Sequence, residues 1–185
     1  MRKSFTFYTS IKNCTSNIFF LKIFILCIIL FGSGMGQKGW GQIYVNTFTG
    51  VQACPTNGNV PTGAINATGT AVTRSTVTCN ATVNVFNSTT LNATATVSNS
   101  SYIEFSATAN TGYKLDVTSL SFFRQGSNTA PNQMEVRYST NGFSTSTTWG
   151  SEPLTPTTGT VATWDFTDFS TSTAGTVTFR IYPYG

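Results

Sequence analysis

The chain has 185 residues, no histidine, a formal net charge of +4 and only 9% charged residues. Four of its ten basic residues lie before or just inside an apolar run near the N-terminus, and the remaining six are balanced by six acidic residues. A body without excess positive charge does not attract a phosphate backbone, so nucleic acid is excluded as the expected partner. The absence of histidine excludes Ser-His-Asp triads, Cys-His nucleophiles and HExxH metal sites.

Residues 1–36 are predicted to form a signal peptide. Ile23–Phe31 is an apolar run that is shorter than the roughly 20 apolar residues of a membrane-spanning helix. Basic residues precede this run and small residues follow it up to Gly36, which is the order of a secretory leader. We therefore expect cleavage after Gly36, with Gly41 as a second choice, and a product that is secreted or held at the cell surface. An uncleaved membrane anchor is the alternative; after cleavage no stable membrane span is expected.

Residues 37–185 have the length of one domain, and Cys54 and Cys79 are the two cysteines in them. In an oxidising compartment such a pair predicts one disulfide, with two free thiols as the alternative. The bridge would stabilise the fold by roughly 3.5 kcal/mol through the entropy of loop closure. Two cysteines without histidine make an incomplete zinc set, so a zinc site is not expected. Asp165 and Asp168 could ligate calcium through oxygen atoms, although a capped turn explains them as well. No metal and no other cofactor is predicted.

The first candidate strand spans residues 42–48. Residues 51–100 are rich in Thr, Asn, Ala and Ser, and they are predicted to be loops and edge strands with one good strand at 81–86. Residues 101–109 alternate apolar and polar side chains, as a half-buried strand does. The next strand spans 115–122, and its alternation slips at Thr118 and Ser119, which predicts a bulge or bend.

Residues 133–139 alternate again, and Asn141 with Gly142 forms a strong turn signal behind them. The last two strands are expected at 161–166, with Trp164 in the core, and at 176–182. Beyond the leader, no window shows the apolar spacing of an amphipathic helix. Strands with one apolar face bury it by packing two sheets face to face. The prediction is therefore an all-β, two-sheet antiparallel β-sandwich.

A jelly roll is favoured over an immunoglobulin-like sandwich, because Cys54 stands beside Pro55 in a loop-like stretch rather than on a core strand. Four segments of the second half carry a resemblance that points the same way: Tyr102–Phe105, Gly112–Phe122, Glu135–Phe143 and Val177–Tyr182. They resemble the jelly-roll modules of secreted Bacteroidota-type proteins, which are often exported to the cell surface by type IX secretion. The resemblance covers a little under half of the chain and implies a fold and a location, with adhesion or glycan binding usually presumed.

The resemblance also implies a further strand. Such modules usually continue past the strand that ends at Tyr182, through a loop, to one more strand. Here Pro183–Gly185 is interpreted as a turn. We therefore expect the β-sandwich domain of residues 37–185 to be incomplete at its C-terminal end, with one sheet exposing an edge.

The expected partner is a polysaccharide or another cell-surface glycan, which exposed rings would bind as flat apolar platforms. Trp149, in a presumed loop at 147–150, and Tyr184 are the candidate rings. Arg124 and Asn128 belong to a polar loop that could line the same surface. For each ring, burial in the core is the alternative, because aromatic side chains mostly contribute buried area.

Two carboxylates are candidates for catalysis. Glu104 and Glu135 lie on polar faces of predicted strands, and glycoside hydrolysis needs only two suitably separated carboxyl groups. Ordinary ion pairs, with Lys114, Arg124 or Arg137, are the stronger expectation. The sequence thus predicts a non-catalytic secreted module for adhesion or glycan binding. An accessory or partial domain of a secreted hydrolase is one alternative, and a structural spacer in a large surface protein is another.

Overall fold

A computed structural model describes residues 5–13, 39–48, 62–153 and 158–185. Within these ranges the chain forms strands and the turns between them, without a helix. Each strand pairing is antiparallel. The all-β class predicted from the alternation is therefore confirmed.

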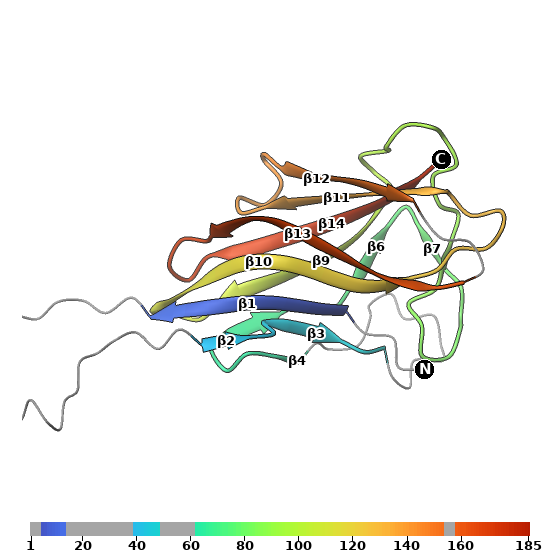
Figure 1. Ribbon diagram of the computed structural model, residues 1–185. Coiled ribbons are helices and arrows are strands. Elements are labelled where there is room, and N and C mark those ends of the chain that lie inside the picture. The colour runs from blue at the N-terminus through green and yellow to red at the C-terminus, as the bar shows by residue number, and fades with distance from the viewer. Residues whose placement is uncertain (1–4, 14–38, 49–61, 154–157) are drawn as a thin grey trace, which may run out of the picture.

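Two sheets pack face to face, and a short hairpin stands apart from them (Figure 1). Sheet A has the order β13 (Thr160–Ser170), β10 (Tyr113–Arg124), β1 (Phe5–Asn13), β3 (Tyr44–Asn46) and β4 (Thr62–Gly63), with β2 (Gly39–Gly41) paired to β1. Sheet B has the order β12 (Thr147–Pro153), β11 (Gln133–Ser139), β14 (Thr176–Tyr184), β9 (Tyr102–Ala109) and β5 (Ala67–Gly69), with β6 (Thr73–Ser75) paired to β9. The hairpin is formed by β7 (Thr78–Cys79) and β8 (Ser88–Thr89).

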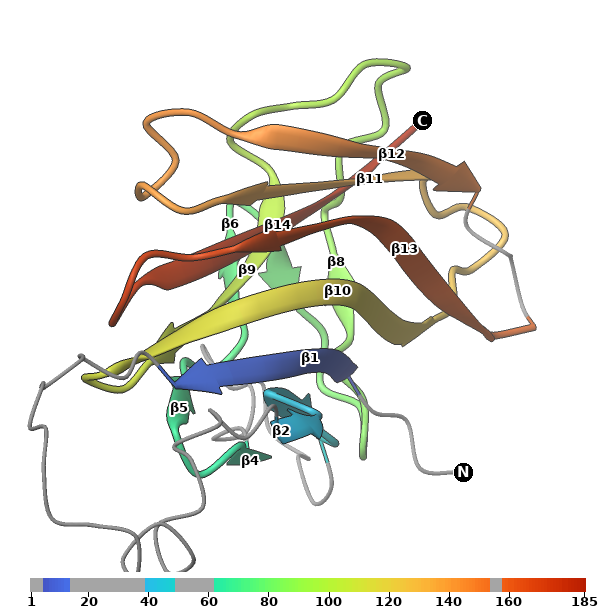
Figure 2. The ribbon, with the colours of Figure 1, turned by 60° about the vertical axis from the view of Figure 1, so that its left-hand side comes forward.

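From β9 onwards the chain changes sheet at nearly every connection (Figure 2). Strands β9, β11, β12 and β14 belong to sheet B, whereas β10 and β13 belong to sheet A. Among the described strands from β9 to β14, β11 and β12 are the pair that follow one another within one sheet. This crossing between layers is the arrangement of a jelly-roll-like sandwich, as the sequence predicted.

The inward faces of the strands fill the space between the sheets. Phe105 and Phe179 are buried on neighbouring strands, and their ring centroids lie 5.4 Å apart. Tyr44 packs on Phe105 at 5.1 Å and donates its hydroxyl to the backbone oxygen of Thr70 at 2.7 Å. Burial raises the pKa of the Tyr44 hydroxyl well above its ordinary value. The tyrosine is therefore a core residue whose single polar atom is satisfied.

Strand β10 contains the predicted bulge. Its register against β13 shifts between Val117 and Ser119, at the point where the sequence alternation slips. Beyond the shift, Phe122 stacks on Trp164 of β13 with ring centroids 4.8 Å apart. Trp164 is buried, so both the bulge and the core position predicted for this tryptophan are confirmed.

Two segments were assigned wrongly from the sequence. Residues 81–86 are not a strand but the loop of the β7–β8 hairpin. The chain reverses at Val83 and Asn84, because Asn84 takes a left-handed backbone with a φ of 59°, a conformation that asparagine tolerates better than most residues. Val83 is 49% exposed, so its alternation with Val85 does not mark a buried face. The presumed loop at 147–150 belongs to β12.

The chain end also differs from the prediction. Pro183 and Tyr184 continue β14 instead of forming a turn, and Pro183 pairs with Met134 of β11. On the other side, the pairing of β14 with β9 reaches only to Ile181. A proline fits here because a strand with one neighbour does not need a donor on both sides.

Strand β1 was not predicted, and it lies inside the expected leader. It pairs along its whole length with β10 and on its other side with β2 and β3. In Figures 1 and 2 it is the dark blue strand beside β10. The apolar run of the leader and Gly36 lie outside the described residues, so cleavage stays a prediction. The part of the chain that the structure describes holds no apolar helix of membrane-spanning length.

Candidate functional site

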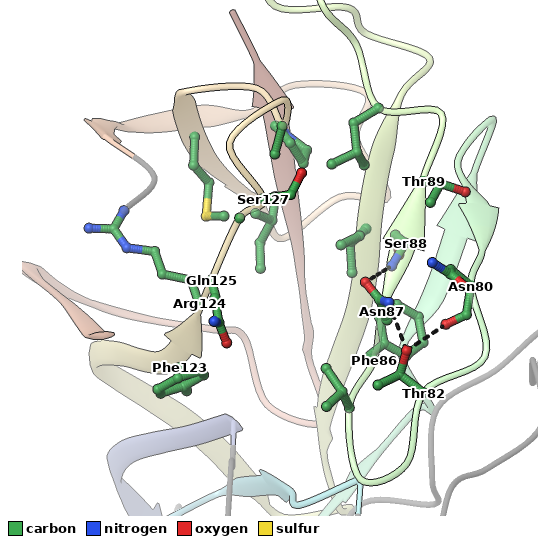
Figure 3. A pocket seen from close by; sticks show the side chains of 18 of the residues that line it. Asn80, Thr82, Phe86, Asn87, Ser88, Thr89, Phe123, Arg124, Gln125 and Ser127 are labelled. Carbon is green, nitrogen blue, oxygen red and sulfur yellow. Dashed lines mark hydrogen bonds between the residues drawn. The ribbon is translucent and has the colours of Figure 1, made fainter. Parts of the chain in front are cut away.

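A cavity of about 770 Å³ lies at one end of the sandwich. Its floor is made by inward residues near strand ends that meet there, such as Phe122 of β10, Met134 of β11 and Ile181 of β14. One side is formed by residues 80–89, which we call the hairpin wall, and another by residues 123–128, which we call the loop wall. Figure 3 shows side chains of both walls around this space.

Hydrogen bonds order the hairpin wall. The side-chain amide of Asn87 donates to Oγ1 of Thr82 at 2.8 Å, and its Oδ1 accepts the backbone N–H of Ser88 at 2.9 Å. The backbone N–H of Asn80 donates across the hairpin to the carbonyl of Asn87 at 3.2 Å. These contacts hold the amide in one orientation, and an amide still retains donor and acceptor capacity beyond two such bonds.

Arg74 of β6 braces the hairpin wall from behind. Its Nε donates to Oγ of Ser88 at 2.9 Å, and its Nη2 donates to the carbonyl of Asn87 at 2.7 Å. The guanidinium carbon also lies 3.4 Å from the centroid of the Phe86 ring. Partial burial lowers the pKa of Arg74 to about 10. A charged side chain at such a position is a positioning element, because it fixes three consecutive residues of the wall.

Phe86 is held between two neighbours. Besides Arg74, its ring faces Phe48 of the segment after β3, at a centroid separation of 5.4 Å. Phe48 and Thr90, at the margins of the hairpin wall, have positive φ values of 53° and 57°. Such a backbone costs roughly 1–2 kcal/mol for a bulky or β-branched residue, and strain of this kind gathers at functional sites. The contacts around the cavity therefore stabilise the fold by more than the free energy that the left-handed backbone of Phe48 and Thr90 costs.

The loop wall carries polar side chains on a strand end and the turn after it. Gln125 and Ser127 lie across the space from Asn87 and Phe86 (Figure 3). Asn128 is exposed and also lines the cavity. The lining is thus a combination of rings, amides and hydroxyls that a neutral polar molecule with apolar faces would match.

Arg124 is the charged residue of this lining, and its head group points away from Phe86 (Figure 3). Its Nη2 lies 2.9 Å from Oε2 of Glu152, in a pair where the arginine side chain is 9% exposed and the glutamate 41%. Nε and Nη1 of Arg124 are buried without a hydrogen-bond partner among the described residues. Glu152 offsets the positive charge of Arg124, so the cavity lining carries little net charge.

The four predicted ligand-binding residues separate into two groups. Arg124 and Asn128 line the cavity. Trp149 instead lies half-buried on β12, in a group of four rings that we call the aromatic cluster: Tyr138, Trp149, Phe169 and Phe179. Trp149 is 4.5 Å from Tyr138 and 5.3 Å from Phe179 between ring centroids. These ring contacts show that Trp149 packs against the fold.

Tyr184 lies at the end of β14, half-buried, and its hydroxyl bonds to Oγ of Ser151 at 3.0 Å. Pro183, which precedes it, belongs to the cavity lining. Since consecutive strand residues point to opposite faces, Tyr184 is directed away from that lining. The structure therefore brings together two of the four candidates and leaves Trp149 and Tyr184 apart from them.

The two candidate carboxylates are both ion-paired on sheet B. Glu104 accepts from Nε of Arg180 at 2.6 Å, and Glu135 pairs with Arg137 at 2.5 Å. Arg180 is also stacked over the ring of Tyr102 at 4.1 Å. Arg137, one of the three partners expected for the two glutamates, pairs with Glu135, whereas Glu104 has a partner on β14 that the sequence did not suggest. Neither glutamate belongs to the cavity lining.

Cys79 ends β7, and its register partner across the hairpin is Ser88. The cysteine is disulfide-bonded. Its predicted partner, Cys54, lies outside the described residues, so the identity of the pair stays a prediction. A bridge at this point would anchor the hairpin wall covalently to the preceding segment.

The sequence did not reveal the hairpin wall. The alternation at 81–86 predicts a strand that includes Thr82 and Phe86, Asn87 lies in the polar stretch of residues 51–100, and no local pattern marks Arg74. One signal was available: Asn80 and Asn87 flank a short apolar run with Asn84 at its centre, a composition that also suits a hairpin loop.

Comparison of this chain with family models, with curated proteins and with solved structures finds no match.

Proposed function

We propose that the chain is an exported, non-catalytic surface module that binds a neutral glycan in the cavity between the hairpin wall and the loop wall. The observation that carries the proposal is the lining of this cavity, where aromatic rings lie together with side-chain amides, among them the hydrogen-bonded amide of Asn87. Its volume of about 770 Å³ falls within the range of about 300–1,000 Å³ found for small-molecule pockets.

The chemistry of a sugar matches this lining. A pyranose ring presents hydroxyl groups at its rim and C–H groups on its faces. Phe86 and Phe123 offer apolar surfaces in the lining, and the side chains of Asn87, Gln125 and Asn128 can both donate and accept hydrogen bonds. Binding in this way needs no charged group at the point of contact.

The charge balance favours a neutral sugar over an acidic one. Arg124 is directed away from Phe86 (Figure 3) and is paired with Glu152. The other lining residues are uncharged. A uronic acid or sulfated sugar would therefore enter the cavity without a free cation to receive its charge.

The non-catalytic assignment has separate support. Glycoside hydrolysis requires an acid and a second carboxylate on the two sides of one bond. Glu104 and Glu135 are each held by an arginine outside the cavity lining. The export part of the proposal rests on the leader of residues 1–36 and on the disulfide state of Cys79.

The test is a glycan array probed with the purified protein, followed by calorimetry with the best neutral oligosaccharide. Phe86→Ala should weaken binding about tenfold, which equals about 1.4 kcal/mol. Phe143→Ala is the matched control, because Phe143 is a half-buried ring that stacks on Arg180 instead of lining the cavity. Equal losses in both variants, or no binding by the wild type, would contradict the proposal.

The same preparation distinguishes the alternatives. A hydrolase part would turn over the oligosaccharide and lose that turnover in Glu104→Gln or Glu135→Gln. A spacer would show neither binding nor turnover. The proposed module binds without turnover, and its binding survives both glutamate substitutions.

A further inference from the structure

The position of β1 in sheet A has a consequence for the exported protein. Strand β1 spans Phe5–Asn13 and lies between β10 on one side and β2 and β3 on the other. The sequence places these same residues in the leader that is removed after Gly36. The strand that completes sheet A in the full chain is therefore expected to be absent from the exported chain.

The residues of β10 that pair with β1 determine which positions of the inserted strand lie on the core face of the sheet. Phe5, Phe7 and Ile11 are the register partners of Phe122, Leu120 and Leu115. These three residues of β10 are buried in the core. Directly opposed residues of an antiparallel pair lie on the same face of the sheet. The slot between β10 and β3 thus takes a nine-residue extended segment whose register shifts between its fourth and fifth residues, with apolar residues at the positions of Phe5, Phe7 and Ile11 and a threonine opposite Val117.

Removal of β1 would leave two facing edges without a partner. Strand β10 would keep β13 as its neighbour and lose its pairing on the other side. Strand β3 would keep β4 and lose its pairing with Phe5 and Thr6. Unpaired edge groups next to an apolar row are the features that bind an added strand from another chain.

We propose that the slot between β10 and β3 is an acceptor site for a β-strand supplied by another protein after the leader has been removed. The donor is an extended peptide that runs antiparallel to β10 and carries apolar side chains at the positions of Phe5, Phe7 and Ile11. The occupant seen in the structure defines this chemistry. The inference rests on the export half of the proposed function and is independent of glycan binding.

The register also indicates how a donor would differ from β1. Lys12 is the register partner of Lys114, and like charges directly opposite one another destabilise an antiparallel pair. Lys114 already has Asp116 at 3.7 Å. A donor with an acidic residue in place of Lys12 would therefore bind more tightly than the leader sequence itself.

The test uses the full chain with a recognition sequence for a specific protease inserted between Gly36 and Gln37. The purified protein is cut under native conditions, the cut leader is dissociated in mild urea and removed by gel filtration, and the refolded remainder is mixed with a fluorescent peptide of the sequence of residues 5–13. Fluorescence anisotropy should report binding of one peptide per cut protein, and none to the uncut protein. Phe7→Asp in the peptide should weaken binding at least tenfold, whereas Lys12→Glu should strengthen it about threefold.

A cross-link locates the bound peptide. A peptide carrying Thr6→Cys should form a disulfide with Ser121→Cys of the cut protein, because these positions are register partners. Ser119→Cys is the control, two residues out of register, and should not react. Cross-linking to the control with equal yield would overturn the assignment of the slot.

Three results contradict the inference. The cut protein stays monomeric and folded without taking up the peptide, which would mean that residues 39–48 close the slot. A second contradicting result is that the cut protein forms a dimer with another copy of itself instead of binding the peptide. The third is that the Phe7→Asp peptide binds as tightly as the original peptide. The peptide-binding test uses protein that is cut after purification, so its result does not depend on whether cells remove the leader. If cells retain the leader, that finding contradicts the proposed export alone.

Discussion

The aromatic cluster and the hairpin wall use aromatic rings in different ways. In the cluster, Tyr138 is covered by Trp149 at 4.5 Å and by Phe169 at 4.1 Å, ring against ring. At the hairpin wall, Phe86 meets one ring and one guanidinium and keeps a place in the cavity lining. The four rings of the aromatic cluster cover one another, whereas the Phe86 ring is held in place at the cavity lining, where the proposal places a ligand.

The largest effect is expected where the hairpin wall is tied to the rest of the chain. Cys79→Ser should lower the free energy of unfolding by about 3.5 kcal/mol if the partner is Cys54. Urea denaturation measures this loss, and wild-type protein in reductant should show the same one. If the variant and the reduced wild type are as stable as the oxidised protein, the bridge does not hold the wall.

Trp149→Ala should cost about 3 kcal/mol of stability, the lower part of the range for buried aromatic residues, because Trp149 is half-buried. Its effect on glycan affinity should be less than twofold. Trp149→Phe keeps a ring in the cluster and should recover most of the stability. A variant that is stable but has lost the ligand would reverse the roles given to the two regions.

Arg74→Met removes two hydrogen bonds and the contact with Phe86, and should cost about 2 kcal/mol. Glycan affinity should fall about threefold, since the hairpin wall is no longer held in place. Arg74→Lys keeps a charge near the ring without the paired donors, and should show about half of each effect. Unfolding and calorimetry together check this prediction; an affinity that does not follow the order of the variants would contradict it.

The smallest change is expected to be favourable. Arg124→Met removes two buried nitrogen atoms that have no hydrogen-bond partner in the described part of the chain, and it breaks a pair whose glutamate is 41% exposed. Loss of that pair should cost less than about 1 kcal/mol, whereas each unsatisfied donor costs about 1–3 kcal/mol. A gain in stability of about 1 kcal/mol is expected by thermal unfolding. A loss of more than about 2 kcal/mol would mean that the Arg124 guanidinium is better satisfied than its contacts indicate.

The sandwich could be predicted because its signal is local. Along β9 and β14 the apolar residues alternate with polar ones, and Phe105 and Phe179 are buried as the pattern requires. The slip at Thr118 and Ser119 likewise marked the bulge of β10. Each of these features depends on neighbours two or three residues away.

The cavity could not be predicted because its contacts are distant in sequence. Arg74 reaches Ser88 across 14 positions, and Phe86 packs on Phe48 of another segment. The alternation of Val83 and Val85 imitates a strand, and only the left-handed backbone of Asn84 turns the chain there. Arg124 and Asn128, which line the cavity, could be proposed from the sequence because a polar loop after a strand is visible locally, although the cavity that it borders is not.

Hydrogen exchange with and without the neutral oligosaccharide selected on the array shows whether ligand binds between the hairpin wall and the loop wall. Protection should rise at backbone amides of residues 80–89 and 123–128 and stay unchanged at residues 138–149. Protection confined to the neighbourhood of Trp149, with the hairpin wall unaffected, would contradict the claim.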